Sequence, residues 1–223
     1  MPRFCLQAKS GHWNKIMNIT RLILIRHGQT DYNLQNRYYG VIDPGLNGEG
    51  IKQAEQLKFE MRRYNIDEVY SSDLRRAYDT AKLVFENYNI QKCSNFREIN
   101  FGILEGLTHE EIMDRYPKLY GDWLEDPENI SLPQGEGVKD LTRRVLRGVI
   151  QIVKRHKGRT VSIVTHGGPI RVLINFVNKN KPNEFWKIRQ ETAAINIFEY
   201  DNNLVPKIVI SNNVSHLKKT RKA

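Results

Sequence analysis

Two histidines stand at matching places in the chain, each directly after a short apolar run and directly before a glycine. His27 follows Arg26, the last residue of the first run, and precedes Gly28. His166 follows Thr165, the last residue of the second run, and precedes Gly167. Short apolar runs of this kind predict buried strands, and ligands of open α/β sheets bind just past the carboxyl ends of strands. We therefore expect both histidines to belong to one site.

The residues beside these histidines fit a phosphate group better than a metal ion. Arg26 has a planar guanidinium fork that matches phosphate oxygens, and Gly28 and Gly167 lack the Cβ that would keep backbone N–H groups away from an anion. Zinc is the main alternative for paired histidines, but it needs a third ligand at a recognisable spacing, and the cation at Arg26 opposes a divalent ion. We therefore expect a phosphate pocket without a metal.

The nucleophile of such a pocket is expected to be a histidine. The sequence has no Gly-x-Ser-x-Gly pattern and no Cys-x5-Arg pattern that would indicate a serine or cysteine nucleophile. Imidazole attacks phosphorus only in its neutral form, and an adjacent guanidinium lowers the pKa of a histidine. Arg26 is therefore expected to keep the lone pair of His27 available at neutral pH.

Four segments together resemble one known family. Residues 24–30 with Asn33 are similar to the signature of the histidine phosphatase superfamily, the phosphoglycerate-mutase-like enzymes. Residues 71–81 resemble the second arginine motif of that family, residues 97–106 its acid motif, and residues 164–167 its second histidine. The segments occur in the order of the family and cover most of the chain.

The resemblance implies a two-step phosphoryl transfer. His27 would accept the phosphoryl group, and Glu98 would protonate the leaving alcohol and then deprotonate the water that hydrolyses the phosphohistidine. Because cationic side chains would neutralise the developing charge, neither a cofactor nor a metal is implied. The side chains implied to bind the phosphoryl oxygens are Arg26, Asn33, Arg76 and His166.

The residues after the acid favour a phosphatase over a mutase. Mutases of this superfamily typically follow the acid with a His-Tyr-Gly run and carry a long insertion before a Gly-Glu motif. Here Glu98 is followed by Ile-Asn-Phe-Gly at 99–102. Only 32 residues, 103–134, lie between Gly102 and Gly135, where the Gly-Glu motif begins. The chain therefore resembles the shorter phosphatase branch.

Two stretches depart from the family pattern. Pro44 and Gly45 stand where the family usually has another residue and then Pro before Leu, and Asn47 replaces the usual hydroxyl cap. Gly137 stands where a serine commonly follows the glutamate. Neither departure touches an implied phosphate ligand, so both concern local turn geometry and substrate binding.

The substrate is the least specified part of the prediction. Residues 97–102, 105–106 and 116–124 resemble the α-ribazole phosphatases of cobalamin synthesis, which implies α-ribazole 5′-phosphate as the substrate. A phosphoserine phosphatase, a broad-specificity phosphatase, a phosphoglycerate mutase and a non-enzymatic phospholigand-binding module remain open as alternatives. Several aromatic residues either pack as ordinary core or stack on a flat leaving group: Tyr38, Tyr39, Tyr116, Tyr120 and Trp123.

The elements that must position these residues alternate along the chain. Asn47 has the character of an N-cap, Thr108 with Glu111 forms a capping-box pattern, and Pro117 is expected to end that helix. Strands separated by helices predict a three-layer α/β/α sandwich with a mostly parallel central sheet. Strands are predicted at 21–26, 69–71, 160–165, 194–200 and 206–210, and helices at 47–64, 73–86, 108–116, 138–156 and 169–177.

Charge and composition exclude several other classes of protein. The net charge is +10, but the segments 1–16 and 218–223 hold seven basic residues and no acid. Residues 17–217 therefore carry a surplus of only three basic residues over acidic ones. An anion site could supply that surplus, so no nucleic-acid partner is expected. No apolar run has the roughly 18 residues that a membrane span needs. Cys5 and Cys93 cannot build a disulfide framework, which favours a cytoplasmic protein.

The organisation expected from these features is one domain with two polar ends. Residues 1–16 are expected to be a disordered N-terminal extension, 17–217 the histidine phosphatase domain, and 218–223 a basic tail. A small-molecule phosphate ester is the expected partner, with no membrane contact. The sequence leaves the oligomeric state open.

Overall fold

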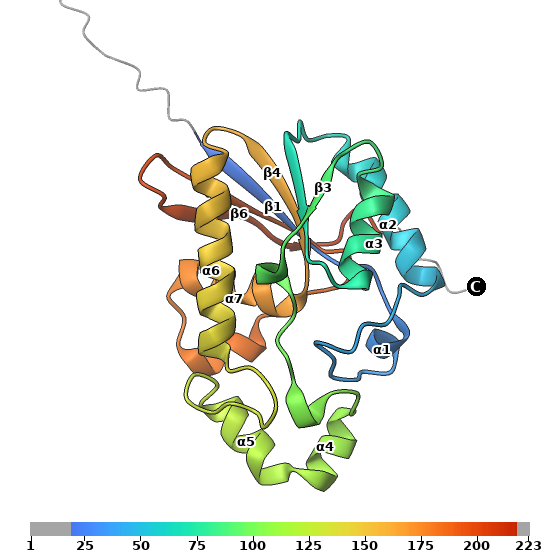
Figure 1. The fold of residues 1–223 in the computed structure, drawn as a ribbon, viewed down its shortest axis with the longest axis vertical. Coiled ribbons are helices and arrows are strands. Elements are labelled where there is room, and N and C mark those ends of the chain that lie inside the picture. The colour runs from blue at the N-terminus through green and yellow to red at the C-terminus, as the bar shows by residue number, and fades with distance from the viewer. Residues whose placement is uncertain (1–18, 218–223) are drawn as a thin grey trace, which may run out of the picture.

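A computed structural model describes residues 19–217 of the chain. The extension expected at 1–16 and the basic tail expected at 218–223 lie outside the described residues. Among the described residues one six-stranded sheet forms the centre, in the order β3-β2-β4-β1-β5-β6 (Figure 1). Its strands are β1 (Thr20–Arg26), β2 (Glu68–Ser71), β3 (Ile90–Lys92), β4 (Thr160–Thr165), β5 (Ile195–Tyr200) and β6 (Pro206–Asn213).

The first four strands of the sheet are parallel and the last two close it in antiparallel fashion. β1 and β2 both pair with β4 in parallel, and β3 pairs with β2 in parallel. β5 runs antiparallel to β1 and β6 antiparallel to β5. The carboxyl ends of β1, β2 and β4 therefore meet at one edge of the sheet, where α/β proteins bind ligands.

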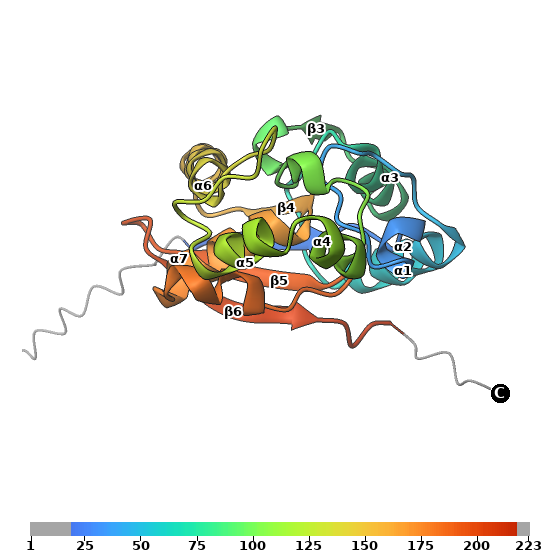
Figure 2. The ribbon, with the colours of Figure 1, turned by 90° about the horizontal axis from the view of Figure 1, so that it is seen from below.

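Helices cover both faces of the sheet. Side chains of β1 alternate between two cores: Leu22 and Leu24 pack in one buried cluster, and Ile23 and Ile25 in the other. The first cluster includes residues of α6 and α7, and the second includes residues of α2 and α3. The three-layer α/β/α sandwich predicted from the sequence is confirmed (Figures 1 and 2). The helices are α1 (Asp31–Leu34), α2 (Gly48–Met61), α3 (Arg75–Val84), α4 (His109–Arg115), α5 (Pro117–Glu125), α6 (Val138–Arg155) and α7 (Gly167–Asn178), with short 3-10 turns η1 (Ser94–Phe96), η2 (Gly102–Leu104) and η3 (Pro182–Lys187).

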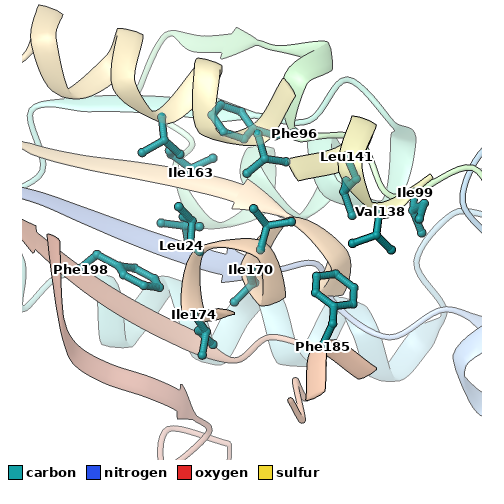
Figure 3. Packing of buried hydrophobic residues seen from close by; sticks show 14 of the residues in the cluster. Leu24, Phe96, Ile99, Val138, Leu141, Ile163, Ile170, Ile174, Phe185 and Phe198 are labelled. Carbon is teal, nitrogen blue, oxygen red and sulfur yellow. The ribbon is translucent and has the colours of Figure 1, made fainter. Parts of the chain in front are cut away.

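The larger core fixes the two strands that carry the histidines. Leu24 of β1 and Ile163 of β4 are fully buried, and Ile170 of α7 and Phe96 of η1 lie in the same cluster (Figure 3). Burial of an aliphatic or aromatic side chain of this size contributes roughly 1.5–3 kcal/mol each. Interlocked side chains of this kind hold the ends of β1 and β4 in one arrangement.

The caps predicted from the sequence are confirmed, but helix α5 was not predicted, and most ends of the predicted helices differ by one to three residues. Asn47 caps α2 by accepting the Gly50 N–H, and Thr108 forms a capping box with the third residue of α4. Pro117 ends α4 as expected, yet it also begins α5, which the sequence did not predict. Proline is favoured at a first helical position because no N–H is needed there, and Tyr116 serves both helices as a cap.

The segment formed by α4 and α5 lies apart from the helix layers. Both helices lie beyond one end of the sheet, at the bottom of the view in Figure 1 and across the sheet in Figure 2. Among residues 19–217, no helix is long and apolar enough to cross a membrane.

Candidate active site

The fold brings the two histidines of the sequence motifs together. β1 and β4 are neighbours, with Arg26 opposite Thr165, so the next residue on each strand is a histidine. The His27 N–H donates to the Thr165 carbonyl oxygen at 2.9 Å. The imidazole rings of His27 and His166 lie edge to face with centroids 5.1 Å apart.

The imidazole of His27 is held in its neutral form with one ring nitrogen free. Its Nδ1 lies 2.7 Å from the Gly28 carbonyl oxygen. Because a carbonyl oxygen only accepts, Nδ1 carries the proton and donates it, which leaves the lone pair on Nε2. Burial lowers the pKa of His27 well below 6.5, and the charges of Arg76 and Arg26 lower it further.

His166 is fully buried beside His27 and takes its support from a third strand. Its Nε2 lies 2.8 Å from the hydroxyl of Ser72, the residue that follows β2. Burial and then the charge of Arg76 lower the pKa of His166 well below 6.5, so this ring is also neutral. Its buried Nδ1 has no hydrogen-bond partner among residues 19–217.

Arg76 lies in the first turn of α3 and is completely buried. Its guanidinium carbon lies 4.6 Å from the centre of the Tyr39 ring, in a cation–π arrangement. The terminal amino groups donate to three acceptors of one loop, which are the carbonyl oxygens of Gly40 (2.9 Å) and Ile42 (3.1 Å) and the Asp43 carboxylate (3.2 Å). This loop therefore fixes the cation that acts on both histidines.

The loop that holds Arg76 is itself held by Glu105. This residue belongs to the acid motif, and its carboxylate joins that motif to the loop through four backbone hydrogen bonds. The donors are the N–H groups of Gly40 (2.8 Å), Val41 (3.1 Å), Ile42 (3.1 Å) and Phe101 (3.0 Å). Hydrogen bonds to a carboxylate are stronger than neutral ones, so Glu105 ties two segments of the site together.

Arg26 and Asn33 approach the site from the cavity side. An amino group of Arg26 donates to the Gln190 carbonyl oxygen, and the guanidinium lines the cavity above His27. Asn33 also lines the cavity. Its Oδ1 accepts from the Thr30 N–H and hydroxyl, both at 3.1 Å. The Nδ2 amide of Asn33 is therefore the group left to donate to a ligand.

Glu98 lies at the amino end of α7, which begins at the last residue of the second histidine segment, residues 164–167. Its two carboxylate oxygens accept from the Gly168 N–H at 3.0 and 3.1 Å, and Oε1 also accepts from the Ile99 N–H at 2.9 Å. A Cβ on residue 168 would lie 2.1 Å from Glu98 Oε1, so a side chain there would displace the carboxylate from this position. The carboxylate is thus held by backbone groups at a fixed place on the cavity wall.

Arg144 of α6 fixes the backbone that carries Glu98. Its guanidinium binds both oxygens of Glu136, at 2.6 and 2.7 Å, so the Gly-Glu-Gly segment anchors this arginine. The remaining hydrogen bonds go to carbonyl oxygens of the acid motif and the turn before it, at Asn95 (2.9 Å), Arg97 (2.7 Å) and Glu98 (3.0 Å). The sequence places Glu136 in the Gly-Glu motif but assigns it no contact, and it does not single out Arg144, whose backbone partners lie 46 to 49 residues away.

The role expected of Gly28 needs correction. Its N–H donates to the Thr80 hydroxyl at 3.0 Å and so does not face an anion. Glycine is required because a Cβ at residue 28 would lie 2.6 Å from the Gly50 carbonyl oxygen. Gly167, by contrast, lines the cavity at the start of α7 as expected.

A cavity of about 650 Å³ opens over His27 and has two chemically different ends. At the first end it is lined by predicted residues, namely Arg26, His27, Asn33, Glu98 and Gly167. We call this part the phosphate end. Arg76 and His166, also predicted, flank His27 without lining the cavity.

The second end, which we call the leaving-group end, has an aromatic wall. The Tyr38 and Tyr120 hydroxyls lie 2.5 Å apart, and the Trp123 and Trp186 rings pack with centroids 4.3 Å apart. Tyr39 also lines the cavity, whereas the expected Tyr116 does not. The wall residues are Tyr38, Phe101, Tyr120, Trp123, Leu124, Arg171 and Trp186.

Sequence reasoning missed two members of this wall. Arg171 follows Gly167 by four residues, and this helical spacing places both on one face of α7, a signal that could have identified it. Trp186 gives no such signal, because η3 lies outside every motif.

Comparison with known proteins decides the family. Residues 22–213 match the Histidine phosphatase superfamily (branch 1). The chain belongs to this superfamily. Phosphoserine phosphatase 1 of Hydrogenobacter thermophilus is 32% identical over 86% of this chain and 93% of its own length. Because the matched family is that of the histidine phosphatases and this relative is a phosphatase, the chain is an enzyme of the phosphatase class.

Solved structures of histidine phosphatases have the same fold. Bacillus stearothermophilus YhfR superposes with a TM-score of 0.83 at 30% identity and covers 89% of this chain and 100% of its own. The alpha-ribazole phosphatase from Shigella flexneri superposes with a TM-score of 0.76 at 27% identity and covers 86% of this chain and 96% of its own. The predicted family and phosphoglycerate-mutase-like fold are confirmed.

Among the described residues, no group of three or more His, Cys, Asp or Glu side chains is arranged to hold a metal ion.

Proposed function

We propose that the chain hydrolyses phosphate monoesters through a phosphohistidine formed on Nε2 of His27. The observation that carries this proposal is the hydrogen bond from His27 Nδ1 to the Gly28 carbonyl oxygen, which leaves the Nε2 lone pair free. A buried imidazole that stays neutral next to two arginines suits attack on an anionic ester.

In the first step, His27 Nε2 attacks phosphorus as the bond to the ester oxygen breaks. Arg26 and the Asn33 amide bind the phosphoryl oxygens from the cavity side, and the charge of Arg76 stabilises them from below. Protonated Glu98 gives its proton to the leaving oxygen, so the alcohol departs neutral.

In the second step, the Glu98 carboxylate takes a proton from water, and the water oxygen attacks phosphorus. The bond between nitrogen and phosphorus breaks, which returns His27 to its neutral form and releases inorganic phosphate. Glu98 regains the proton it needs for the next turnover. The backbone hydrogen bonds from Gly168 and Ile99 support both roles, because they keep the carboxylate in one place.

The test is hydrolysis of p-nitrophenyl phosphate followed by trapping of the intermediate. We expect release of nitrophenol and phosphate, and an acid-labile, base-stable phosphoprotein after rapid quench. Mapping the phosphoryl group to a residue other than His27, or finding no hydrolysis of any ester in a broad panel, would contradict the proposal.

Two substrates are supported by separate observations. α-Ribazole 5′-phosphate, the substrate favoured by the sequence, is supported by the aromatic wall and by likeness to the Shigella flexneri enzyme. Against stacking, Trp123 has no exposed surface and Tyr120 is 4% exposed, so little of either ring is free for a ligand.

Phosphoserine is supported by likeness to the Hydrogenobacter thermophilus enzyme and by the cationic Arg171 in the same wall. A panel of the two esters with 3-phosphoglycerate and p-nitrophenyl phosphate separates the candidates. A kcat/KM at least about tenfold higher for one ester identifies that ester as the preferred substrate. A difference of about 1.4 kcal/mol in transition-state binding gives that ratio. Equal values would support a broad-specificity phosphatase.

A further inference from the structure

One cation of the cavity has no role in the two-step reaction. Arg171, in the second turn of α7, is half-buried and lines the leaving-group end. Its Nε donates to the Ile188 carbonyl oxygen at 2.8 Å. Within residues 19–217 its terminal amino groups have no hydrogen-bond acceptor, and the guanidinium has no carboxylate within ion-pair distance.

The other arginines of the cavity are accounted for. Arg37 donates to the Gly106 carbonyl oxygen and pairs with Glu111 at 3.1 Å. Arg26 adjoins His27 and takes part in phosphate binding in the proposed mechanism. Arg171 therefore lines the cavity with two terminal amino groups that have neither a protein partner among the described residues nor a role in the proposed phosphate binding.

The position of Arg171 relative to Glu98 places it on the side of the leaving group. A Cβ at Gly167 would lie 3.3 Å from an amino group of Arg171 and 3.7 Å from Glu98 Oε2. Both side chains therefore approach the same point of the cavity wall. Since Glu98 must reach the ester oxygen of the leaving group, Arg171 must lie close to the atoms attached to that oxygen.

The surroundings of Arg171 make an unpaired charge unfavourable. The Trp186 ring, 5.8 Å from the guanidinium carbon, packs on Trp123 and keeps water from that side. Burial lowers the pKa of Arg171, and the charge of Glu98 only partly offsets this. Glu98 lies beyond ion-pair distance of Arg171, and its oxygens accept from the Gly168 and Ile99 N–H groups. A buried guanidinium in this situation is stabilised by an anion that supplies two oxygens.

We propose that Arg171 binds a carboxylate of the leaving group, and that the preferred substrates are phosphate monoesters of small hydroxy acids. The inference rests on the proposed function and identifies its substrate class. A carboxylate fits this guanidinium, because its two oxygens match the two terminal amino groups and its single negative charge matches the single positive charge of Arg171. The neutral nucleoside of α-ribazole 5′-phosphate would leave Arg171 without a partner, so the structure favours an ester of the phosphoserine type.

Matched pairs of substrates test this inference on the unaltered protein. O-phosphoserine is compared with O-phosphoethanolamine, which lacks only the carboxylate, and 3-phosphoglycerate with glycerol 3-phosphate, which has a hydroxymethyl group in its place. We expect kcat/KM to be at least about tenfold higher for the carboxylate member of at least one pair. Ratios near one in both pairs overturn the inference.

Variants connect the preference to the residue. Arg171→Met removes the charge and fork, and we expect the ratio within the preferred pair to fall to about two or less. Arg171→Lys keeps a charge without the fork and should give an intermediate ratio. Arg147→Met is the control, because Arg147 is exposed on α6, far in sequence from every residue of the cavity, and its ratio should match that of the unaltered protein.

The outcomes separate this inference from the proposed function. If the protein hydrolyses p-nitrophenyl phosphate but Arg171→Met leaves the kcat/KM ratio within the substrate pair unchanged, the role of Arg171 is rejected. The proposal that the chain is a phosphatase then still stands. Absence of hydrolysis of every ester rejects the phosphatase itself. If Arg171→Met does not fold, the ratios of the unaltered protein and of Arg171→Lys still decide.

Discussion

The two ends of the cavity are built in different ways. At the phosphate end, His27 and His166 follow neighbouring strands in register, and each is fixed within a residue or two of the sheet. At the leaving-group end, Tyr38, Trp123 and Trp186 come from separate segments and are brought together by packing. The comparison teaches that chemistry in this protein depends on the backbone of the sheet, whereas recognition depends on side chains that meet from distant parts of the chain.

The two ends also differ in their electrostatics. Burial and two arginines hold His27 neutral, and its partner His166 is neutral for similar reasons. The leaving-group end has a desolvated cation, Arg171, inside an otherwise aromatic wall. Substitutions at the phosphate end should therefore reduce turnover of every substrate, and substitutions at the other end should change which substrate is preferred.

The largest expected effect is at the phosphate end. His27→Ala should lower kcat for p-nitrophenyl phosphate by about 10⁴-fold or more, because it removes the covalent path and not one contact. Tyr120→Phe, which removes a hydroxyl at the leaving-group end, should change the same rate by less than about fivefold. Steady-state kinetics of both variants measure the contrast. More than about a tenth of the activity left in His27→Ala means that His27 is not the nucleophile.

Glu98→Gln changes a residue of the phosphate end, and its effect should depend on the leaving group. For an alkyl ester, whose alkoxide needs a proton, we expect a loss of about 10²- to 10⁴-fold. For p-nitrophenyl phosphate, whose phenolate leaves without a proton, the first step should persist while hydrolysis of the intermediate slows. Rapid-quench kinetics should then show a burst close to one equivalent of nitrophenol. Equal losses in the first step for both esters would show that Glu98 does not protonate the leaving group.

Arg144→Met should have a smaller effect that acts through Glu98. The five hydrogen bonds of Arg144 fix the backbone of the acid motif, so their loss should lower kcat by about tenfold with a smaller change in KM. Arg143→Met is the matched control, since its neighbouring side chain is exposed and pairs only with Asp140 within the described residues. Glu136→Gln should resemble Arg144→Met. A change in KM alone would point to substrate binding in place of positioning.

The neutral histidines of the phosphate end should make the fold sensitive to acid. The pKa of His27 in the folded protein lies well below 6.5, while in the unfolded chain it returns to about 6.5, so the unfolded state binds more protons as the pH falls below that value. The free energy of unfolding should therefore fall by up to about 1.4 kcal/mol per pH unit for this group, below about pH 6.5. Thermal melts between about pH 7.5 and pH 5 should show a smaller decrease in Tm for His27→Asn than for the unaltered chain. The exposed His109→Asn serves as the control, and identical slopes in all three proteins would contradict the assignment.

The smallest expected effect is that of chelation. Because Arg26 and Arg76 supply the positive charge at the phosphate end, dialysis against EDTA should leave the rate with p-nitrophenyl phosphate within about twofold. Loss of activity that returns on adding one divalent ion would overturn the mechanism.

The sequence was sufficient for the parts that depend on local rules. The position of His27 at a strand end, the Asn47 cap and the Thr108 capping box follow from residues within a few positions of one another. The start of α5 at Pro117 was missed because a proline can end one helix, begin the next, or do both. Only the path of the chain shows that Pro117 does both.

The candidate site shows the same division. The sequence indicated Arg76 and Glu98 through the motif that each belongs to, but not the Glu105 and Arg144 contacts that hold these segments in place. It also assigned the Gly28 N–H to an anion, although that group is taken by Thr80, 52 residues away. Partners at such separations depend on the packing of whole elements, which no local pattern specifies.

The sequence by itself therefore determined the family and the layered fold and indicated the candidate reacting groups, because strand ends, caps and short motifs are local. The tertiary structure alone decided which groups face the cavity. It left the two terminal amino groups of Arg171 without a protein partner among the described residues, set Trp186 against Trp123, and packed Arg76 on the Tyr39 ring. These arrangements join residues from distant segments, and they arise only when the helices and the sheet pack together.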